Sequence, residues 1–384
     1  MPATQEAKKD PVIVVLQLTG GNDYVNTAIP YNNPLYRDNR KAVGIPDDQI
    51  MHLDGQYGIP PYMAPLKQFW DDKKLAILHG VGWKESPRSH FRAMDIWHTC
   101  EPVKVGTEGW LGRVAREFDP KKENVVTTVS FGPSLPRALA VAGVPVACVG
   151  GPLENYGFLP TIQGNQRKQI LERFAAMYKP AIGTGAVMDY MADTGIDSLK
   201  GEDILKVAPQ RYSSTVQYPN TSIARKLKGI AQVHFADLGT RIFYCDHSTF
   251  DTHAGQNAAG SPGSHPVLWK AVTEGIDAFM KDLREHDHAD NVILLMFSEF
   301  GRRVRDNGSG TDHGAGGVAF VLGDKVKGGH YGEMPSLEAS KLVQGDLDPN
   351  MDFRSVYSTI LDKWLKLNPA PIVNGTFEQP AFLN

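Results

Sequence analysis

Residues 291–317 read NVILLMFSEFGRRVRDNGSGTDHGAGG, and this stretch decides the class of fold. The apolar run from Val292 to Phe297 shows no polar alternation, which is typical of a strand buried on both faces of a mostly parallel sheet. The run ends abruptly at Ser298-Glu299, and a glycine-rich segment then leads to Asp312-His313. Open α/β sheets bind ligands at the carboxyl ends of their strands. The stretch therefore predicts both a central strand and part of a site.

Further apolar runs of the same kind occur along the chain, at residues 12–18, 74–82, 144–151, 241–248 and 318–323. Amphipathic helical patterns fall between or after them, at residues 90–100, 170–178, 222–234, 268–286 and 353–365. Strands that alternate with helices predict an α/β protein, and more specifically a three-layer α/β/α sandwich with a mostly parallel central sheet.

The chain has 384 residues, which suits one large α/β domain. We expect that domain to span residues 11–366 and to be followed by a C-terminal tail at 367–384. Residues 151–225 are polar, rich in turn residues and weak in strand signal. They predict an insertion of helices and loops, a kind of segment that often shapes a substrate pocket.

Composition excludes several classes of partner. The net charge of -3 gives no strong attraction to nucleic acid or to an anionic membrane. No apolar stretch approaches the roughly 18 residues of a membrane span. Three widely spaced cysteines without a CxxC pair argue against a disulfide framework or a thiolate zinc site. The N-terminus shows no export signal, so we expect a cytoplasmic protein, or a periplasmic one if a twin-arginine signal was removed.

Candidate site residues follow four of the apolar runs: Asp23, then Arg88, Ser89 and His90, then Asp251 and His253, and finally Glu299 and His313. Carboxylates and imidazoles without cysteine suit zinc, manganese, iron or magnesium. Carboxylates that converge at one edge repel one another, so a cation or a shared proton is expected there. Taken singly, each residue also has a plain structural interpretation as a turn, cap or surface residue.

The segment around Ser89 has two interpretations. A serine before the helical pattern at 90–100 is a natural N-cap, but it is also placed for a nucleophile that gains from the helix dipole. Arg88 has a guanidinium that suits phosphate or sulfate, although arginines on exposed faces are usually solvated. His90 is either a general acid or a residue that orients another group.

Six motifs occur in order along the chain: LTGGNDYVNTAIPYNNPLY, SPRSHFRAMDIWHT, GTEGWLGR, FDTHAGQ, SEFGRRVRDNGSGTDHG and VKGGHYG. Together they resemble the "domain of unknown function 1501" family of bacterial proteins, over about residues 11–366. That family is similar to a remote branch of the alkaline phosphatase superfamily, which includes sulfatases. The resemblance implies an alkaline phosphatase-like fold.

The resemblance also implies roles. Asp23 matches the first metal-binding acid, and Ser89 matches the nucleophile. Asp251 and His253 resemble the Asp…His pair, Glu299 stands where a later Asp-His pair begins, and His313 resembles the final histidine. Two departures from the superfamily pattern concern the metals. Asp251 and His253 are only two residues apart, and Phe300 stands in place of a histidine of the second metal site.

We therefore expect a metal-dependent hydrolase that acts on a small anionic phosphate or sulfate ester, with Ser89 as nucleophile and His90 and Arg88 assisting. One or two divalent ions (zinc, manganese or magnesium) would be held by Asp23, Asp251, His253, Glu299 and His313. Two alternatives stay open. One is a non-catalytic binding or assembly protein that keeps the fold, and the other is a metal-dependent hydrolase or lyase for another substrate class.

Overall fold

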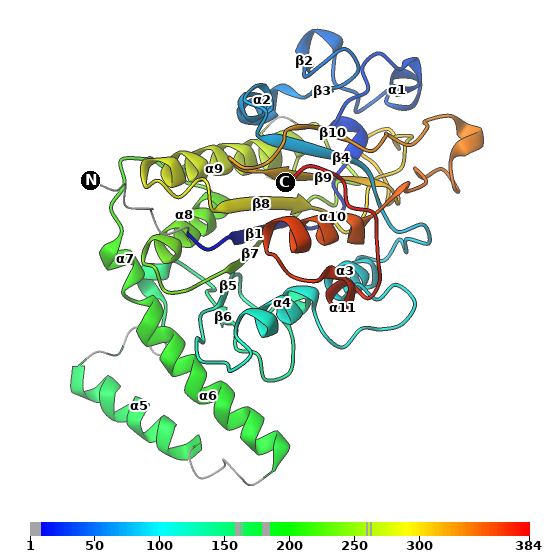
Figure 1. Ribbon diagram of the computed structural model, residues 1–384. Helices are drawn as coiled ribbons and strands as arrows, with labels where there is room; N and C mark the ends of the chain where they lie inside the picture. The colour runs from blue at the N-terminus through cyan, green and yellow to red at the C-terminus, as the bar shows by residue number, and fades with distance from the viewer. Residues whose placement is uncertain (1–8, 158–161, 163, 179–184, 259, 262) are drawn as a thin grey trace, which may run out of the picture.

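The computed structural model describes residues 9–157, 162, 164–178, 185–258, 260–261 and 263–384. Its centre is a mixed nine-stranded sheet with helices on both faces (Figure 1). The strands lie in the order β10-β4-β9-β8-β1-β7-β5-β6, and β11 pairs with the same edge of β4 as β10 does. The predicted three-layer α/β sandwich is thereby confirmed.

The strands of the sheet are β1 (Val12–Leu18), β4 (Leu75–Gly82), β5 (Thr128–Phe131), β6 (Ala147–Cys148), β7 (Ile242–His247), β8 (Val292–Phe297), β9 (Gly317–Leu322), β10 (Gly329–Tyr331) and β11 (Met351–Asp352). A separate hairpin is formed by β2 (Met51–His52) and β3 (Gly58–Ile59). The helices are α1 (Pro34–Asn39), α2 (Ala64–Asp71), α3 (His90–Thr99), α4 (Trp110–Phe118), α5 (Gly164–Tyr178), α6 (Ala186–Leu205), α7 (Ala208–Arg211), α8 (Ser222–Phe235), α9 (His265–Glu285), α10 (Phe353–Thr359) and α11 (Pro369–Val373).

Strand β1 is buried along its whole length, because both of its faces are covered. Val14 and Leu16 belong to a core that includes residues of α8 and α9, whereas Ile13 and Val15 belong to a second core with residues of α3, α4 and α10. Alternate side chains of a strand point to opposite faces, so the continuous apolar run of β1 supplies both cores at once. This is the physical reason why the run shows no polar alternation.

The central strands bring their polar ends to one edge of the sheet. β1 pairs in parallel with β7 on one side and with β8 on the other, and Gln17 lies opposite both Asp246 and Phe297. The chain segments that follow Leu18, His247 and Phe297 therefore leave the sheet at the same edge. These are three of the segments that carry the candidate site residues.

Several features of the sheet differ from the sequence-based expectation, including the short strands β10 and β11, which were not predicted. β9 runs antiparallel to both of its neighbours, β4 and β8, so the sheet is mostly but not wholly parallel. β5 lies between β7 and β6 at a place where no strand was predicted. Its four residues begin with Thr128 and are too few to give a clear apolar run.

Within the predicted insertion at 151–225, the structure describes helices α5, α6 and α7 and the start of α8. Arg167 of α5 and Glu202 of α6 form an ion pair between these two helices. Figure 1 shows the two helices extending away from the sheet, well apart from the C-terminal end of β8 in this view. The expectation that this insertion shapes the substrate pocket gains no support from that placement.

The C-terminal residues 367–384 pack against the rest of the chain. Helix α11 contacts α4 and α10, and Phe382 and Leu383 are buried in the second core. Within the part of the chain that the structure describes, no helix has the length and apolar composition needed to cross a bilayer.

Buried histidines make the stability of the fold depend on pH. Burial lowers the pKa of His79 and His234 to about 3 and that of His98 to about 4. In the unfolded chain a histidine has a pKa of about 6.5, so below that pH the unfolded chain binds more protons than the folded one. The free energy of unfolding should be highest above pH 6.5. It should fall by up to about 1.4 kcal/mol per pH unit for each histidine as the pH decreases toward 4.

Urea unfolding at pH 7.0, 6.0 and 5.5 measures this slope. The variant His98→Asn should reduce this slope by up to about 1.4 kcal/mol per pH unit, because it removes one of the buried histidines. The exposed residue His52 supplies the control, and His52→Asn should leave the slope unchanged. Equal slopes for wild type and His98→Asn would contradict the assignment.

Candidate functional site

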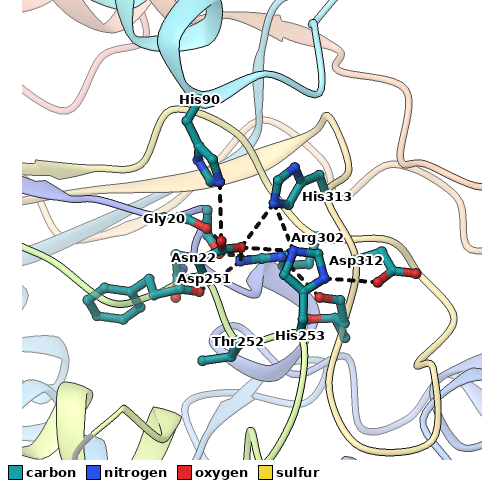
Figure 2. A network of polar contacts seen from close by, with 12 residues as sticks. Gly20, Asn22, His90, Asp251, Thr252, His253, Arg302, Asp312 and His313 are labelled. Atoms are coloured by element: carbon teal, nitrogen blue, oxygen red, sulfur yellow. Dashed lines mark hydrogen bonds and ion pairs between the residues drawn. The ribbon is translucent and has the colours of Figure 1, made fainter.

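Three histidines from separate segments converge on the carboxylate of Asp251 (Figure 2). His313 Nε2 lies 2.9 Å from Asp251 Oδ1, and His253 Nε2 lies 3.1 Å from the same oxygen. His90 Nε2, at the start of α3, lies 3.5 Å from Asp251 Oδ2. The Nε2 atoms of His253 and His313 are only 3.0 Å apart. Four side chains predicted for the site therefore meet in one cluster, which we call the three-histidine centre.

Each histidine of the three-histidine centre is held through its other ring nitrogen. The Nδ1 atoms of His90, His253 and His313 lie 2.8 Å, 3.0 Å and 2.8 Å from Glu299 Oε1, Asp312 Oδ1 and the Arg88 carbonyl oxygen. Carbonyl and carboxylate oxygens only accept hydrogen bonds, so the protons belong on Nδ1. Each Nε2 then faces Asp251, where it either donates to the carboxylate or, without a proton, presents a lone pair to a metal ion.

This arrangement fits a bound cation. Three lone pairs and a carboxylate that face one another repel unless positive charge lies between them. The Nε2 atom of His90 is buried and has no hydrogen-bond partner. His90, Asp251 and His313 offer ligand atoms that all lie close to one another, and His253, 3.0 Å from His313, would supply a fourth ligand in a set that suits zinc and also manganese. The hydrogen bond that each Nδ1 makes to an oxygen is the usual way in which proteins orient a histidine ligand.

Glu299, which the sequence predicts as a metal ligand, contacts the Nδ1 atom of His90 and therefore lies on the side of that ring away from Asp251. Its side chain is fully buried, and its Oε1 accepts hydrogen bonds from the Gly20 amide at 2.8 Å and from His90. The hydrogen bond to Glu299 raises the pKa of His90. Glu299 thus orients a candidate ligand and ties it to the end of β1.

Asp23, also a predicted ligand, is engaged elsewhere. Both of its carboxylate oxygens accept hydrogen bonds from Arg40 at 2.7 Å, and Oδ2 also accepts one from Gln256 at 2.6 Å. Burial raises the pKa of Asp23, but the charges of Arg40 and His265 and the hydrogen bonds from Gln256 and Arg40 together lower it below its ordinary value. The pair is completely buried. Sequence reasoning missed Arg40, because nothing in its local pattern marks it.

Arg88 and Ser89 flank the centre in different ways. The guanidinium of Arg88 donates to Asp346 Oδ2 at 3.0 Å and 2.8 Å, while its backbone carbonyl holds His313. Ser89 is exposed and occupies the N-cap position of α3, but its side chain makes no capping hydrogen bond. Ser89 lies in the chain between Arg88 and His90, which both contact the centre.

The floor of the centre is formed by Arg302 and Phe300. Arg302 is fully buried and donates to Asp251 Oδ1 at 2.6 Å. Burial would raise the pKa of Asp251, but hydrogen bonds from Arg302 and His313 lower it to about 2. The ring of Phe300 packs at 4.9 Å from the rings of both His90 and His313.

Gly20 explains why β1 ends in a glycine pair. A Cβ atom at Gly20 would lie 2.4 Å from the Asp251 amide nitrogen, and the residue has a φ of +123°. Only glycine combines that conformation with so close an approach of two backbones. The LTGG sequence therefore lets the end of β1 lie directly against the segment that carries Asp251.

A second group of possible ligands, Asp282, Glu285 and His286, is a weaker candidate. The two ring nitrogens of His286 lie 2.9 Å and 2.8 Å from the backbone carbonyls of Asp282 and Ser213. Both nitrogens thus face acceptors, and neither directs a lone pair toward the carboxylates. Tyr212 and Tyr218 also donate to Asp282. These hydrogen bonds engage both ring nitrogens of His286 and Asp282 Oδ2, whereas the buried Asp282 Oδ1 has no hydrogen-bond partner among the described residues.

Comparison with solved structures finds members of the alkaline phosphatase superfamily. A superfamily protein from Vibrio parahaemolyticus has a TM-score of 0.42 and 8% identity, covering 95% of this chain and 71% of that one. The PsFucS1 sulfatase from Pseudoalteromonas sp. has a TM-score of 0.36 and 13% identity, and the match covers 97% of this chain and 70% of the sulfatase. Alkaline phosphatase from the Antarctic bacterium TAB5 has a TM-score of 0.36 and 12% identity, and the match covers 83% of this chain and 93% of the phosphatase. These scores are too low to support an argument about activity.

In sequence, no curated protein matches the chain. The family model described as "Protein of unknown function (DUF1501)" matches residues 208–370, which include β7, α9, β8 and β9 with Asp251, His253 and His313. Over these residues the chain matches the DUF1501 family, which its motifs resemble.

Proposed function

We propose that the protein is a metal-dependent hydrolase of a phosphate or sulfate ester. The observation that carries this proposal is the three-histidine centre, where the Nε2 atoms of His90, His253 and His313 face Asp251 and where His90 directly follows the exposed residue Ser89 in sequence. A divalent ion bound by these four residues would polarise the ester oxygens and stabilise the negative charge of the transition state.

The residues around the centre have distinct roles in this proposal. Ser89 is the nucleophile, and its oxygen bonds to phosphorus or sulfur as the bond to the leaving alcohol breaks. Its position at the start of the ten-residue helix α3 favours an anionic group there, because backbone N–H groups point outward at a helix N-terminus. Glu299, Asp312 and the Arg88 carbonyl orient the three histidines.

These roles differ from the sequence-based assignment at three residues. His90 becomes a metal ligand instead of a general acid or a residue that orients another group, and Glu299 becomes the residue that orients His90. Asp23 is left out of the ligand set, because Arg40 and Gln256 already occupy its oxygens. We propose that the buried Asp23–Arg40 pair instead supports the loop that follows β1.

Phe300 favours a second candidate function. Its ring fills the space next to His90 and His313 with apolar surface, which reduces the room for a second ion. A protein that keeps one ion without turnover, and binds an anionic partner, is consistent with that packing. The two functions are separated by the variant at Ser89 described below.

The purified protein should bind about one equivalent of zinc or manganese at the three-histidine centre. His90→Ala, His253→Ala and His313→Ala should each abolish tight binding, because each removes one of four ligands. Glu299→Gln should weaken binding by roughly 10–100-fold, as is usual when the partner of a histidine ligand is lost. Elemental analysis and competition with a chelator measure both effects.

His286→Ala is the matched control, since His286 belongs to the second group of possible ligands. This variant should bind the same amount of metal as the wild type. If His286→Ala loses the ion while His313→Ala keeps it, the ion binds at the other group and the proposed centre is wrong.

Ser89→Ala should abolish ester turnover while leaving bound metal unchanged, because the hydroxyl is the nucleophile and not a ligand. Initial rates with p-nitrophenyl phosphate, bis(p-nitrophenyl) phosphate and p-nitrophenyl sulfate measure this. The nearby variant Ser86→Ala is the control and should retain activity. Turnover that survives in Ser89→Ala would argue against this nucleophile. A metal-loaded wild type that turns over none of the esters would favour the binding protein.

A further inference from the structure

The guanidinium of Arg302 is enclosed by oxygen atoms from three separate segments. Its Nε donates to the Gly21 carbonyl at 2.8 Å, and one terminal nitrogen donates to the Thr311 carbonyl at 3.0 Å. The other terminal nitrogen donates to the carbonyls of Gly20 and Phe250 at 2.6 Å and 3.0 Å, and to Asp251 Oδ1 at 2.6 Å. The side chain is completely buried, so these oxygens take the place of its hydration shell.

This set of oxygens resembles the environment of a hard metal ion. Backbone carbonyls and a carboxylate are the ligands that calcium and magnesium prefer in proteins. Without a cation, several carbonyl dipoles would point at one another in a space without water, which is costly. Here the cation is the side chain of Arg302 itself. Arg302 follows β8 in the chain, and a backbone bridge pairs it with His313.

One carboxylate oxygen joins this oxygen cage to the three-histidine centre. Asp251 Oδ1 accepts from Arg302 and also lies 2.9 Å from His313 Nε2 and 3.1 Å from His253 Nε2. Figure 2 shows that Arg302 and the three histidines lie around Asp251. A second metal ion that shared Asp251 would therefore have to take the place of the guanidinium.

We propose that Arg302 is the permanent second cation of the centre, so that the site holds a single metal ion and cannot take two. This inference rests on the proposed metal-dependent function and specifies the number of ions. Arg302 is a positioning residue in this scheme, because it touches Asp251 and backbone oxygens only. It fixes the carboxylate in one orientation and supplies the charge that a second ion would otherwise bring.

Removing the guanidinium tests the proposal through the number of bound ions. Wild type should bind one equivalent of Mn²⁺, whereas Arg302→Ala should bind a second equivalent in the vacated oxygen cage. Millimolar guanidinium should compete with that second ion and return the number to one. Arg302→Lys keeps a cation and should remain at one equivalent. Equilibrium dialysis followed by elemental analysis gives these numbers without any assay of activity.

Arg40→Ala is the matched control, because Arg40 is also fully buried and its side chain pairs with Asp23 instead of Asp251, although it donates to the Arg303 carbonyl. The Arg40→Ala variant should still bind one equivalent of Mn²⁺, even if the substitution lowers the stability of the protein. If Arg302→Ala fails to fold alone, its refolding yield should rise with guanidinium or Mn²⁺. No recovery with either would overturn the proposal.

The remaining outcomes separate this inference from the proposed function. Two equivalents in the wild type, lost together in His313→Ala, would overturn the role of Arg302 and keep the metal-dependent function. One equivalent in the wild type, in Arg302→Ala and in Arg302→Lys would also overturn it. No metal in the wild type would overturn both proposals.

Discussion

The burial of β1 on both faces is the constraint on which the rest of the structure depends. Seven consecutive residues without exposure leave no place for a functional side chain within the strand. Chemistry is therefore restricted to the point where the strand ends, and β7 and β8 end at the same edge because they pair with β1 in parallel. Asp251, His253 and His313 follow those two strands, and the Gly20 amide at the end of β1 holds Glu299.

Much of the architecture could be predicted because burial determines composition. The continuous apolar runs at β1, β4 and β8 have only one common explanation, a strand covered on two sides. The direction of β9 could not be predicted, because an apolar run has the same composition whether it lies parallel or antiparallel to its neighbours. β5 was missed for a different reason, since four residues that begin with threonine give little periodic signal.

The sequence indicated which residues lie near the candidate site better than it indicated what each residue does there. Position after a strand indicates that a polar side chain lies at the edge, but it does not indicate which neighbour that side chain contacts. Arg88 lies 258 residues from Asp346 in sequence, and no local pattern connects them. The pairing of Asp23 with Arg40 depends on how the loop after β1 folds, which is a tertiary property. Glu299 has the chemistry of a ligand, and only geometry distinguishes a ligand from the partner of one.

The pairing of β1 also has a consequence for how the chain is made. β1 is synthesised well before its partners β7 and β8, which begin at Ile242 and Val292. At synthesis rates of about 5–20 residues per second, roughly 10 to 50 seconds pass before β7 exists. During that interval a mostly apolar strand lacks these two partners. Such long-range pairing slows folding and leaves the strand open to aggregation or chaperone binding.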